Sequence, residues 1–213
     1  MAKRHLRGKL LEDYKKLLVL TDIQKDILIG TLLGDASMSL RNGKPHYSVK
    51  FEQGEIHAPY IEHLYQIFES FTGSPPEWRF TNKEHTRRAL WFRTYRHDQL
   101  IFYWNLFYKT KPDQSKVKIV PTNIHQFLTP RALAYWFMDD GSKKENTFVL
   151  HTQGFEKHES EKLCEALKRN YNIVSNLHKD KDYWKIYINQ QSAETFKDLV
   201  KPYVIDCFAY KLN

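Results

Sequence analysis

Two apolar runs stand out from an otherwise mixed pattern of hydrophobic and polar positions, Leu28–Ala36 and Leu133–Gly141. Each is hydrophobic nearly all round a helical wheel, which predicts a buried helix. An acid holds the eighth of the nine places in both runs, giving Asp35 and Asp140, which lie 105 positions apart in a chain of 213 residues. The matched spacing predicts a duplicated unit whose two helices pack together and bring their acids to one place.

Helix start signals precede both runs. Thr21 and Gln24 fit a capping box, and Thr129–Pro130 places a capping hydroxyl before a first-turn proline. Gly30 and Gly34 are four residues apart on one helix face, where the absence of side chains lets a partner backbone approach closely. We therefore expect the first helix to contact the second along this glycine face.

The rest of the chain changes between helical and strand periodicity. We expect helices over residues 10–20, 22–35, 58–71, 97–108, 131–140, 155–171 and 191–200, and strands over 36–41, 46–53, 77–80, 88–94, 147–153, 173–179 and 183–189. Asn42-Gly43 is a strong hairpin signal between the first two strands. We interpret the pattern as an α+β protein made of two pseudo-symmetric αββαββα halves.

Four segments follow from this pattern. Residues 1–21 form a basic arm and a lead-in helix, 22–110 the first half, 111–129 a polar linker broken by Pro112 and Pro121, and 130–213 the second half.

The charge balance is basic, with 33 Lys and Arg against 25 Asp and Glu and a formal net charge of +8. Such a balance suits a polyanionic partner. Cys164 and Cys207 form neither a metal-ligand spacing nor a disulfide framework, so a reducing compartment is the default. No apolar stretch is long enough to cross a bilayer, so no membrane partner is expected. A mitochondrion, a chloroplast and a bacterial or archaeal cytoplasm all remain open.

Each central helix ends at an acid, which is the wrong charge for the negative end of a helix dipole. Unpaired backbone carbonyls also gather at that end. A divalent cation resolves both problems, and oxygen ligands of this kind suit Mg²⁺. We expect Asp35 and Asp140 as metal ligands, with the carbonyls of Gly34 and Asp139 as additional ones. The alternative is that each acid is only a solvated helix end.

The residues at this point carry a resemblance. Two segments resemble the paired motifs of the LAGLIDADG homing endonucleases, in the single-chain branch encoded by introns. They are Ile29–Ala36 and Leu133–Gly141, the second preceded by Thr129–Pro130. The first run departs from the motif, with Gly34 where the family name has alanine and Ala36 where it has glycine. The resemblance implies a DNA-binding saddle and a monomeric, Mg²⁺-dependent endonuclease that cuts both strands of a long asymmetric double-stranded DNA site, promoting intron homing. The resemblance also implies that Mn²⁺ or Ca²⁺ can take the place of Mg²⁺ in binding.

Two lysines and two glutamines are further candidate catalytic residues. The resemblance places a family lysine near the scissile phosphate at Lys118, and Lys211 holds the matching point after the second half. Gln53 and Gln153 precede glycines at the same step of each half, and similar family positions hold polar residues around the site. The alternatives are that Lys118 is one basic residue of a linker, that Lys211 belongs to a frayed terminus, and that both glutamines are ordinary surface residues.

Basic side chains on strand faces and hairpin tips are candidates for reading DNA, because a two-stranded ribbon fits the major groove. They are Arg41, Lys44, Lys50, Arg79, Lys83, Arg87, Arg88, Arg93, Lys143, Lys144, His151, His178, Lys179, Lys181 and Lys185. Any one of them could instead be a solvated charge or a phosphate contact, which carries no sequence information.

Two rival functions share the fold. An intron RNA maturase would bind nucleic acid without cutting DNA, which makes intron RNA a second candidate partner. A transcription regulator would have lost the acids and gained a helix-turn-helix, and the sequence shows neither change.

Overall fold

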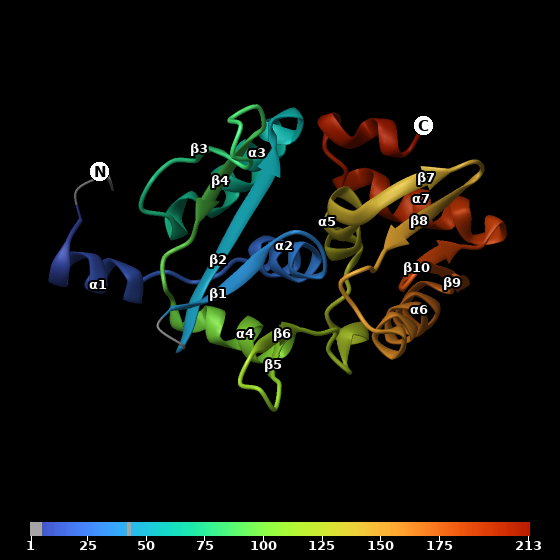
Figure 1. Ribbon diagram of the computed structural model, residues 1–213, viewed down its shortest axis with the longest axis horizontal. Coiled ribbons are helices and arrows are strands. Elements are labelled where there is room, and N and C mark those ends of the chain that lie inside the picture. Colours follow the sequence, from blue (N-terminus) through green and yellow to red (C-terminus); the bar gives the residue numbers. More distant parts are fainter. Residues whose placement is uncertain (1–5, 42–43) are drawn as a thin grey trace. The chain divides into compact units, whose positions relative to one another are not determined.

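The computed structural model of the chain describes residues 6–41 and 44–213, and side chains outside 40–46 (Figure 1). It divides into two compact units. The first holds the described residues up to Lys25 together with Asp35–Trp104, and the second holds Asp26–Gly34 together with Asn105–Asn213.

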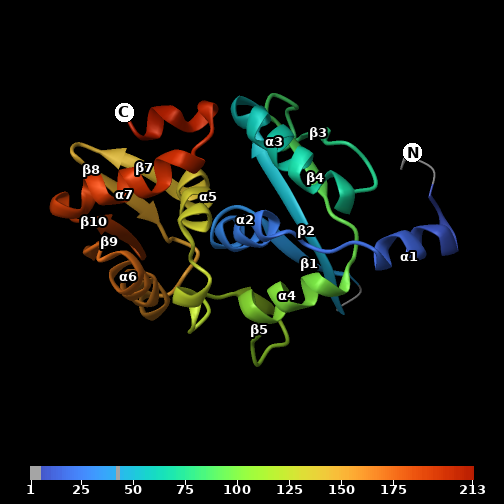
Figure 2. The ribbon, with the colours of Figure 1, turned by 180° about the vertical axis from the view of Figure 1, so that it is seen from behind.

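The first unit is built on a four-stranded antiparallel sheet in the order β1-β2-β4-β3. Its elements are α1 (Gly8–Lys16), the start of α2 (Asp22–Leu33), β1 (Ser37–Arg41), β2 (Lys44–Gly54), α3 (Ala58–Phe68), β3 (Glu77–Phe80), β4 (Arg88–Arg93) and the start of α4 (Ile101–Phe107). Helix α3 packs on β2 and β4 (Figures 1 and 2). Phe51 lies 4.9 Å from Phe92 and 5.2 Å from Phe68 between ring centroids, which forms the centre of this core.

The second unit repeats the plan with a four-stranded sheet in the order β7-β8-β10-β9. Its elements are a small hairpin of β5 (Tyr108–Thr110) and β6 (Lys116–Lys118), then α5 (Pro130–Asp140), β7 (Gly141–Lys144), β8 (Thr147–His151), α6 (Lys157–Tyr171), β9 (Ser175–Asp180), β10 (Tyr183–Ile188) and α7 (Ala193–Val200). Helices α5 and α7 lie side by side in both views (Figures 1 and 2). Phe137, Phe148 and Phe196 join α5, β8 and α7 in one aromatic cluster.

Helix α5 forms as its sequence predicts. The Thr129 hydroxyl accepts the Ala132 backbone N–H at 3.1 Å, and Pro130 supplies the first turn. Residues 132–138 are all buried. Gly141 then leads straight into β7, and a Cβ at this position would lie 2.0 Å from a ring carbon of Phe137. Only glycine allows the helix to turn directly into a strand here.

The C-terminal part of α2 belongs to the second unit because glycines allow it to lie against α5. A Cβ on Gly30 would stand 2.2 Å from the Ala132 carbonyl oxygen, and one on Gly34 would stand 2.4 Å from the Cβ of Asp139. The close approach expected along the glycine face is therefore present. The segment boundaries given above at residues 21, 110 and 129 stay a prediction, and the two compact units divide the chain at other residues.

The expected α+β class and the αββαββα order of both halves are confirmed. Strand β7 was not expected, because Ser-Lys-Lys has no apolar alternation and forms a strand only by pairing with β8. Residues 111–129 are more than a linker, since they contain β6 and bury Val120, Ile124 and Leu128.

The Asn42-Gly43 turn and the first five residues of the basic arm lie outside the described residues. None of the described helices combines the length and apolarity needed to traverse a bilayer.

Candidate catalytic site

The candidate site in the second unit begins where α2 and α5 end together. A Cβ on Gly34 would overlap the side chain of Asp139, with its carboxylate oxygen at 2.5 Å. The two backbones therefore meet at their C-terminal turns, immediately before Asp35 and Asp140 in the chain. Carbonyl oxygens that lack helical partners concentrate at such ends.

Lys118 and Lys211 reach these carbonyls from two different elements. Lys118, at the end of β6, donates from Nζ to the Gly34 carbonyl oxygen at 2.8 Å. Lys211, at the end of a 3₁₀ segment over Asp206–Lys211, donates to the Met138 carbonyl oxygen at 2.6 Å. Both side chains are half-buried. Each helix end, with its negative dipole, thus has one ammonium group against it.

A hollow of about 210 Å³ brings together three of the predicted site residues. Asp140, Lys118 and Gln153 all line it, together with the Gly34 backbone and His151. Gln153 follows β8 by two residues, so the turn after this strand delivers it to the end of α5. The structure therefore brings together an acid, an ammonium group and an amide from three elements.

A second hollow, of about 530 Å³ in the first unit, contains Asp35 and Gln53. The Gln53 side-chain Nε2 donates to the Asp35 carboxylate at 2.6 Å, which fixes the orientation of this acid. Glu52, Arg87 and Arg88 also line the hollow. In the first half the candidate Gln53 is thus a direct hydrogen-bond partner of the candidate Asp35, a contact that the sequence did not indicate.

His151 is a member of the site that the sequence suggested only as a DNA contact. Its Nε2 lies 3.0 Å from the Ser142 hydroxyl, and the ring lines the hollow of Asp140. Burial lowers the pKa of His151, and the nearby charges of Lys185 and Lys211 lower it further. The available signal was positional: His151 precedes Gln153 by two residues at the end of a strand.

The oxygen groups at these helix ends fit a hard divalent cation that retains water. Within residues 6–41 and 44–213, no three His, Cys, Asp or Glu side chains gather into a metal cluster. An ion at either acid would therefore rely on one carboxylate, a backbone carbonyl and oxygens from water or phosphate. Mg²⁺ is commonly held this way, by one or two carboxylates and substrate phosphates. The Gly34 carbonyl oxygen accepts the Lys118 ammonium group, and a carbonyl oxygen has two lone pairs.

The solvent face of the first sheet carries several of the predicted DNA contacts. Glu52 forms ion pairs with Lys50 at 2.7 Å and with Arg79, and both cations keep the pKa of Glu52 low despite its partial burial. Arg93 donates to the Ser39 and Ser48 hydroxyls at 3.0 and 3.3 Å. These side chains are held in defined directions before any partner binds.

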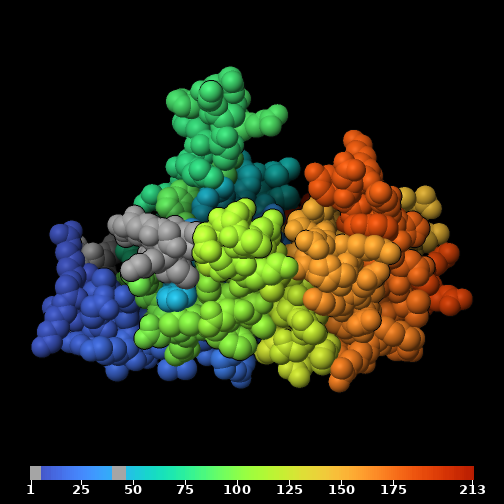
Figure 3. All heavy atoms as spheres, turned by 60° about the horizontal axis from the view of Figure 1, so that its bottom comes forward, coloured from blue at the N-terminus to red at the C-terminus, as the bar shows by residue number. Residues whose placement is uncertain are grey.

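The connection between β3 and β4 projects from the surface of the first unit (Figure 3). It presents Lys83 and Arg87 to solvent, while Arg88 pairs with Glu55 and stacks over Trp78 with its Cζ 4.7 Å from the ring centroid. Arg41 and Lys44 pair across the β1–β2 hairpin, and their side chains lie outside the described part.

The second sheet offers a comparable surface. Tyr187 is at its centre, with the Lys144 ammonium group 4.9 Å from its ring centroid and the His178 ring at 4.3 Å. Lys185 pairs with Asp180. The remaining candidates are exposed: Lys143 on the edge strand β7, Lys179 on β9 and Lys181 in the turn that follows.

Comparison with known proteins gives one consistent result. Residues 25–196 match the profile of the LAGLIDADG DNA endonuclease family. A probable intron-encoded endonuclease from Wickerhamomyces canadensis is 36% identical, with 96% of this chain and 90% of that protein covered. DNA endonuclease I-ChuI from Chlamydomonas applanata is 32% identical over 91% of this chain and 96% of its own. A cytochrome b mRNA maturase, bI2, from Debaryomyces hansenii is also 32% identical, over 88% of this chain and 72% of its own.

Two solved structures share the fold. The homing endonuclease I-WcaI bound to its DNA recognition sequence superposes with a TM-score of 0.82 at 33% identity, covering 97% of this chain and 93% of that one. I-DmoI in complex with DNA and Mn has a TM-score of 0.52 at 15% identity, covering 83% and 94% of the two chains. The fold is therefore that of the homing endonucleases.

Proposed function

This chain belongs to the LAGLIDADG DNA endonuclease family, and from that membership we propose that it is a site-specific endonuclease that cuts both strands of a long asymmetric DNA duplex. The observation that carries the proposal is the hollow at the end of α5, where Asp140, Lys118 and Gln153 converge. This is the set of groups that phosphodiester hydrolysis requires: an acid to hold a cation, a positive charge for the phosphate, and a polar group to orient them.

Asp35 and Asp140, with the carbonyls of Gly34 and Asp139, would hold the divalent cations. Mg²⁺, when bound, supplies charge neutralisation at the phosphate and a more acidic attacking water. Gln53 already holds the Asp35 carboxylate in one orientation. Lys118 and Lys211 place positive charge where negative charge develops on the phosphate. With one acid in each half, a single chain can serve both strands, so the protein acts as a monomer.

The two sheets would supply recognition. Lys50, Arg79 and Arg93 on one sheet and Lys144, His178 and Lys185 on the other stand on solvent faces of strands suited to a major groove. Neutralising several phosphates makes affinity fall steeply with salt. The intron-encoded relatives support a role in intron homing, in whichever of the three candidate compartments the intron resides.

A second candidate function is intron RNA maturation, which the similarity to the bI2 maturases favours. Both acids and both lysines are in place here, which supports nuclease activity.

The test is a selection of cleavable sites from a randomised duplex library, with Mg²⁺ and with a chelator. We expect one long asymmetric site to be cut on both strands with Mg²⁺ and no cutting with chelator. Mn²⁺ should restore activity and Ca²⁺ should support binding alone. Binding to the host intron RNA, with no duplex cut under any of these metals, would overturn the nuclease proposal in favour of the maturase.

Lys118→Met should lower the cleavage rate on bound DNA about a hundredfold, because it removes the ammonium group at the Gly34 carbonyl while keeping the apolar stem. Lys116→Met is the matched control, since it lies two residues earlier on the same strand and bonds to Thr110 instead. Single-turnover cleavage measures both variants. Equal rates for the two would remove Lys118 from the site.

A further inference from the structure

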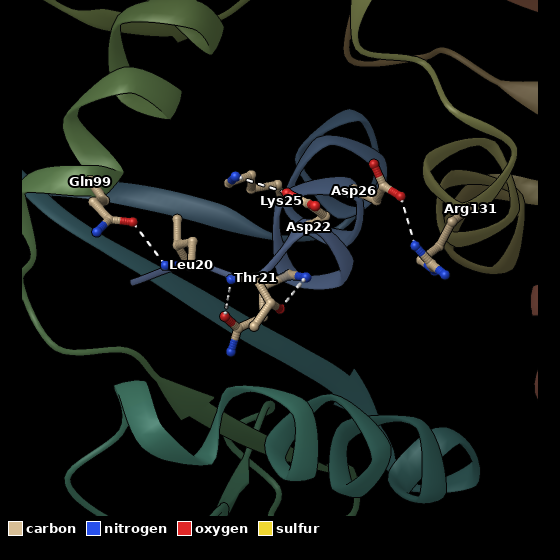
Figure 4. Close-up of polar contacts among 8 residues, drawn as sticks. Leu20, Thr21, Asp22, Lys25, Asp26, Gln99 and Arg131 are labelled. Carbon is tan, nitrogen blue, oxygen red and sulfur yellow. Dashed lines mark hydrogen bonds and ion pairs between the residues drawn. The ribbon is translucent and has the colours of Figure 1, made fainter. Parts of the chain in front are cut away.

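An ion pair joins α2 to α5 at the end of the helix pair that is far from the acids. Arg131 Nη1 donates to the Asp26 carboxylate at 2.8 Å, and the two side chains are 27% and 21% exposed (Figure 4). The partners are 105 positions apart in sequence, the same separation as Asp35 and Asp140. Asp26 and Arg131 are therefore equivalent positions of the two repeats, each nine residues before its acid.

The ion pair is the first layer of a seam between the helices. On α2 and at the residue that follows it, the contact positions recur every four residues, at Asp26, Gly30 and Gly34. On α5 the facing residues Arg131, Tyr135 and Asp139 have the same spacing. The second layer sets Gly30 against Tyr135, whose Cβ would be 2.8 Å from an added Cβ, and the third sets Gly34 against Asp139.

The glycine layers allow close approach only where a glycine faces α5, because any Cβ there would collide with it. The Asp26–Arg131 layer adds a polar pair, and a polar pair at a helix interface specifies register. Among these three layers the Asp26–Arg131 pair is the one with two complementary charges. Arg131 is itself held in place, with its Cζ 5.0 Å from the ring centroid of Tyr203.

We propose that Asp26 and Arg131 are positioning residues for DNA cleavage: their ion pair helps to set the register of α2 on α5 and so places the Gly34 carbonyl and Asp140 at the helix ends. The proposal rests on the nuclease function proposed above. A helix rises about 1.5 Å per residue, so a shift by one residue displaces these groups by about that distance. Misplacement by about 1 Å can cost a hundredfold in rate.

The pair also selects its partner. An Asp facing an Arg requires α2 against α5, whereas two copies of α2 or two copies of α5 brought together would place like charges against each other. This asymmetry within an otherwise repeated structure favours pairing within one chain.

The first test compares Asp26→Asn with Asp22→Asn. Asp22 also forms an ion pair on α2, with Lys25 at 2.9 Å, but that pair stays on its own helix and is exposed (Figure 4). Asp26→Asn should slow double-strand cleavage about tenfold and let nicked DNA accumulate, with affinity for the site within twofold of the original chain. Asp22→Asn should leave cleavage unchanged. Equal cleavage by both variants would overturn the proposal.

Two double variants separate register from stability. The exchanged pair Asp26→Arg with Arg131→Asp should recover at least half of the original cleavage rate, although either change alone should lose tenfold or more. The apolar pair Asp26→Leu with Arg131→Met should keep the melting temperature, since apolar groups of similar volume can replace an ion pair without loss. It should still cleave about tenfold more slowly. Full cleavage by this apolar variant would show that the ion pair contributes to stability alone and would contradict the positioning role proposed here.

A readout without DNA keeps this inference distinct from the nuclease function. Amide hydrogen exchange at the last turns of α2 and α5 should speed up at least fivefold in Asp26→Asn and stay unchanged in Asp22→Asn. If the original chain cuts no DNA but exchange responds in this way, the nuclease function fails and the register role stands. If exchange does not respond, the register role fails whatever the enzyme does.

Discussion

Asp140→Asn is expected to abolish double-strand cleavage, with a loss of about a thousandfold or more in rate. The change keeps the shape of the side chain but removes the negative charge that, under the proposed function, would hold a divalent cation at the end of α5. That loss corresponds to about 4 kcal/mol of transition-state stabilisation. DNA affinity should stay within about threefold, because the proposed binding would rest on phosphate contacts spread over both sheets. Supercoiled plasmid carrying the selected site would report nicked and linear products separately.

The same result is expected for Asp35→Asn, since each acid would serve one strand. Glu165→Gln on the exposed side of α6 is a suitable control, because it also replaces one carboxylate by an amide but lies outside both hollows. It should cut at the original rate. Full double-strand activity in either Asp variant would show that the acid it replaces is not part of the machinery.

Gly30→Ala should destabilise the protein by about 2 kcal/mol, although alanine favours a helix over glycine by roughly 1 kcal/mol. The added Cβ would stand 2.2 Å from the Ala132 carbonyl oxygen, which is backbone and cannot rotate away. Overpacking of this kind costs about 1–3 kcal/mol or more, and so severe a contact lies at the upper end. The melting temperature should fall by about 4–8 °C for a chain of this length.

Gly54→Ala provides the matched comparison, because a Cβ there meets nothing within 4 Å. Its backbone φ of −59° suits any residue, so this variant should melt at the original temperature or slightly above it. Calorimetry of the two variants side by side measures the cost of separating α2 from α5. A Gly30→Ala protein as stable as the original would mean that the helices can part without penalty.

Most of the repeated architecture could be predicted from local signals alone. Thr129–Pro130 fixes where α5 begins, and the unbroken apolar run that follows fixes its burial. Gly30 and Gly34 predicted the close helix approach, because two glycines on one face of a buried helix leave room for a neighbouring backbone. Asp35 and Asp140 were visible because they hold matching positions of the repeat. Lys118 and Lys211 were visible through the resemblance to the family. The roles of all four stay predictions.

Contacts between distant segments were invisible in the sequence. Ser-Lys-Lys forms β7 only because β8 presents an open edge to it. Lys118 could have been one of many basic residues in a polar segment, and it gains a specific partner because β6 ends beside the Gly34 carbonyl. His151 enters the hollow of Asp140 for the same reason.

The sequence by itself determined most of the elements, the order of the two halves and the family, because capping and periodicity act within a few residues of the chain and the motif is a local pattern. Only the tertiary structure decided which polar groups meet: Gln53 with Asp35, Lys211 with Met138, and Asp26 with Arg131. Partners so far apart in sequence are selected by packing geometry, since a polar group can bond only to a partner that the fold brings within reach.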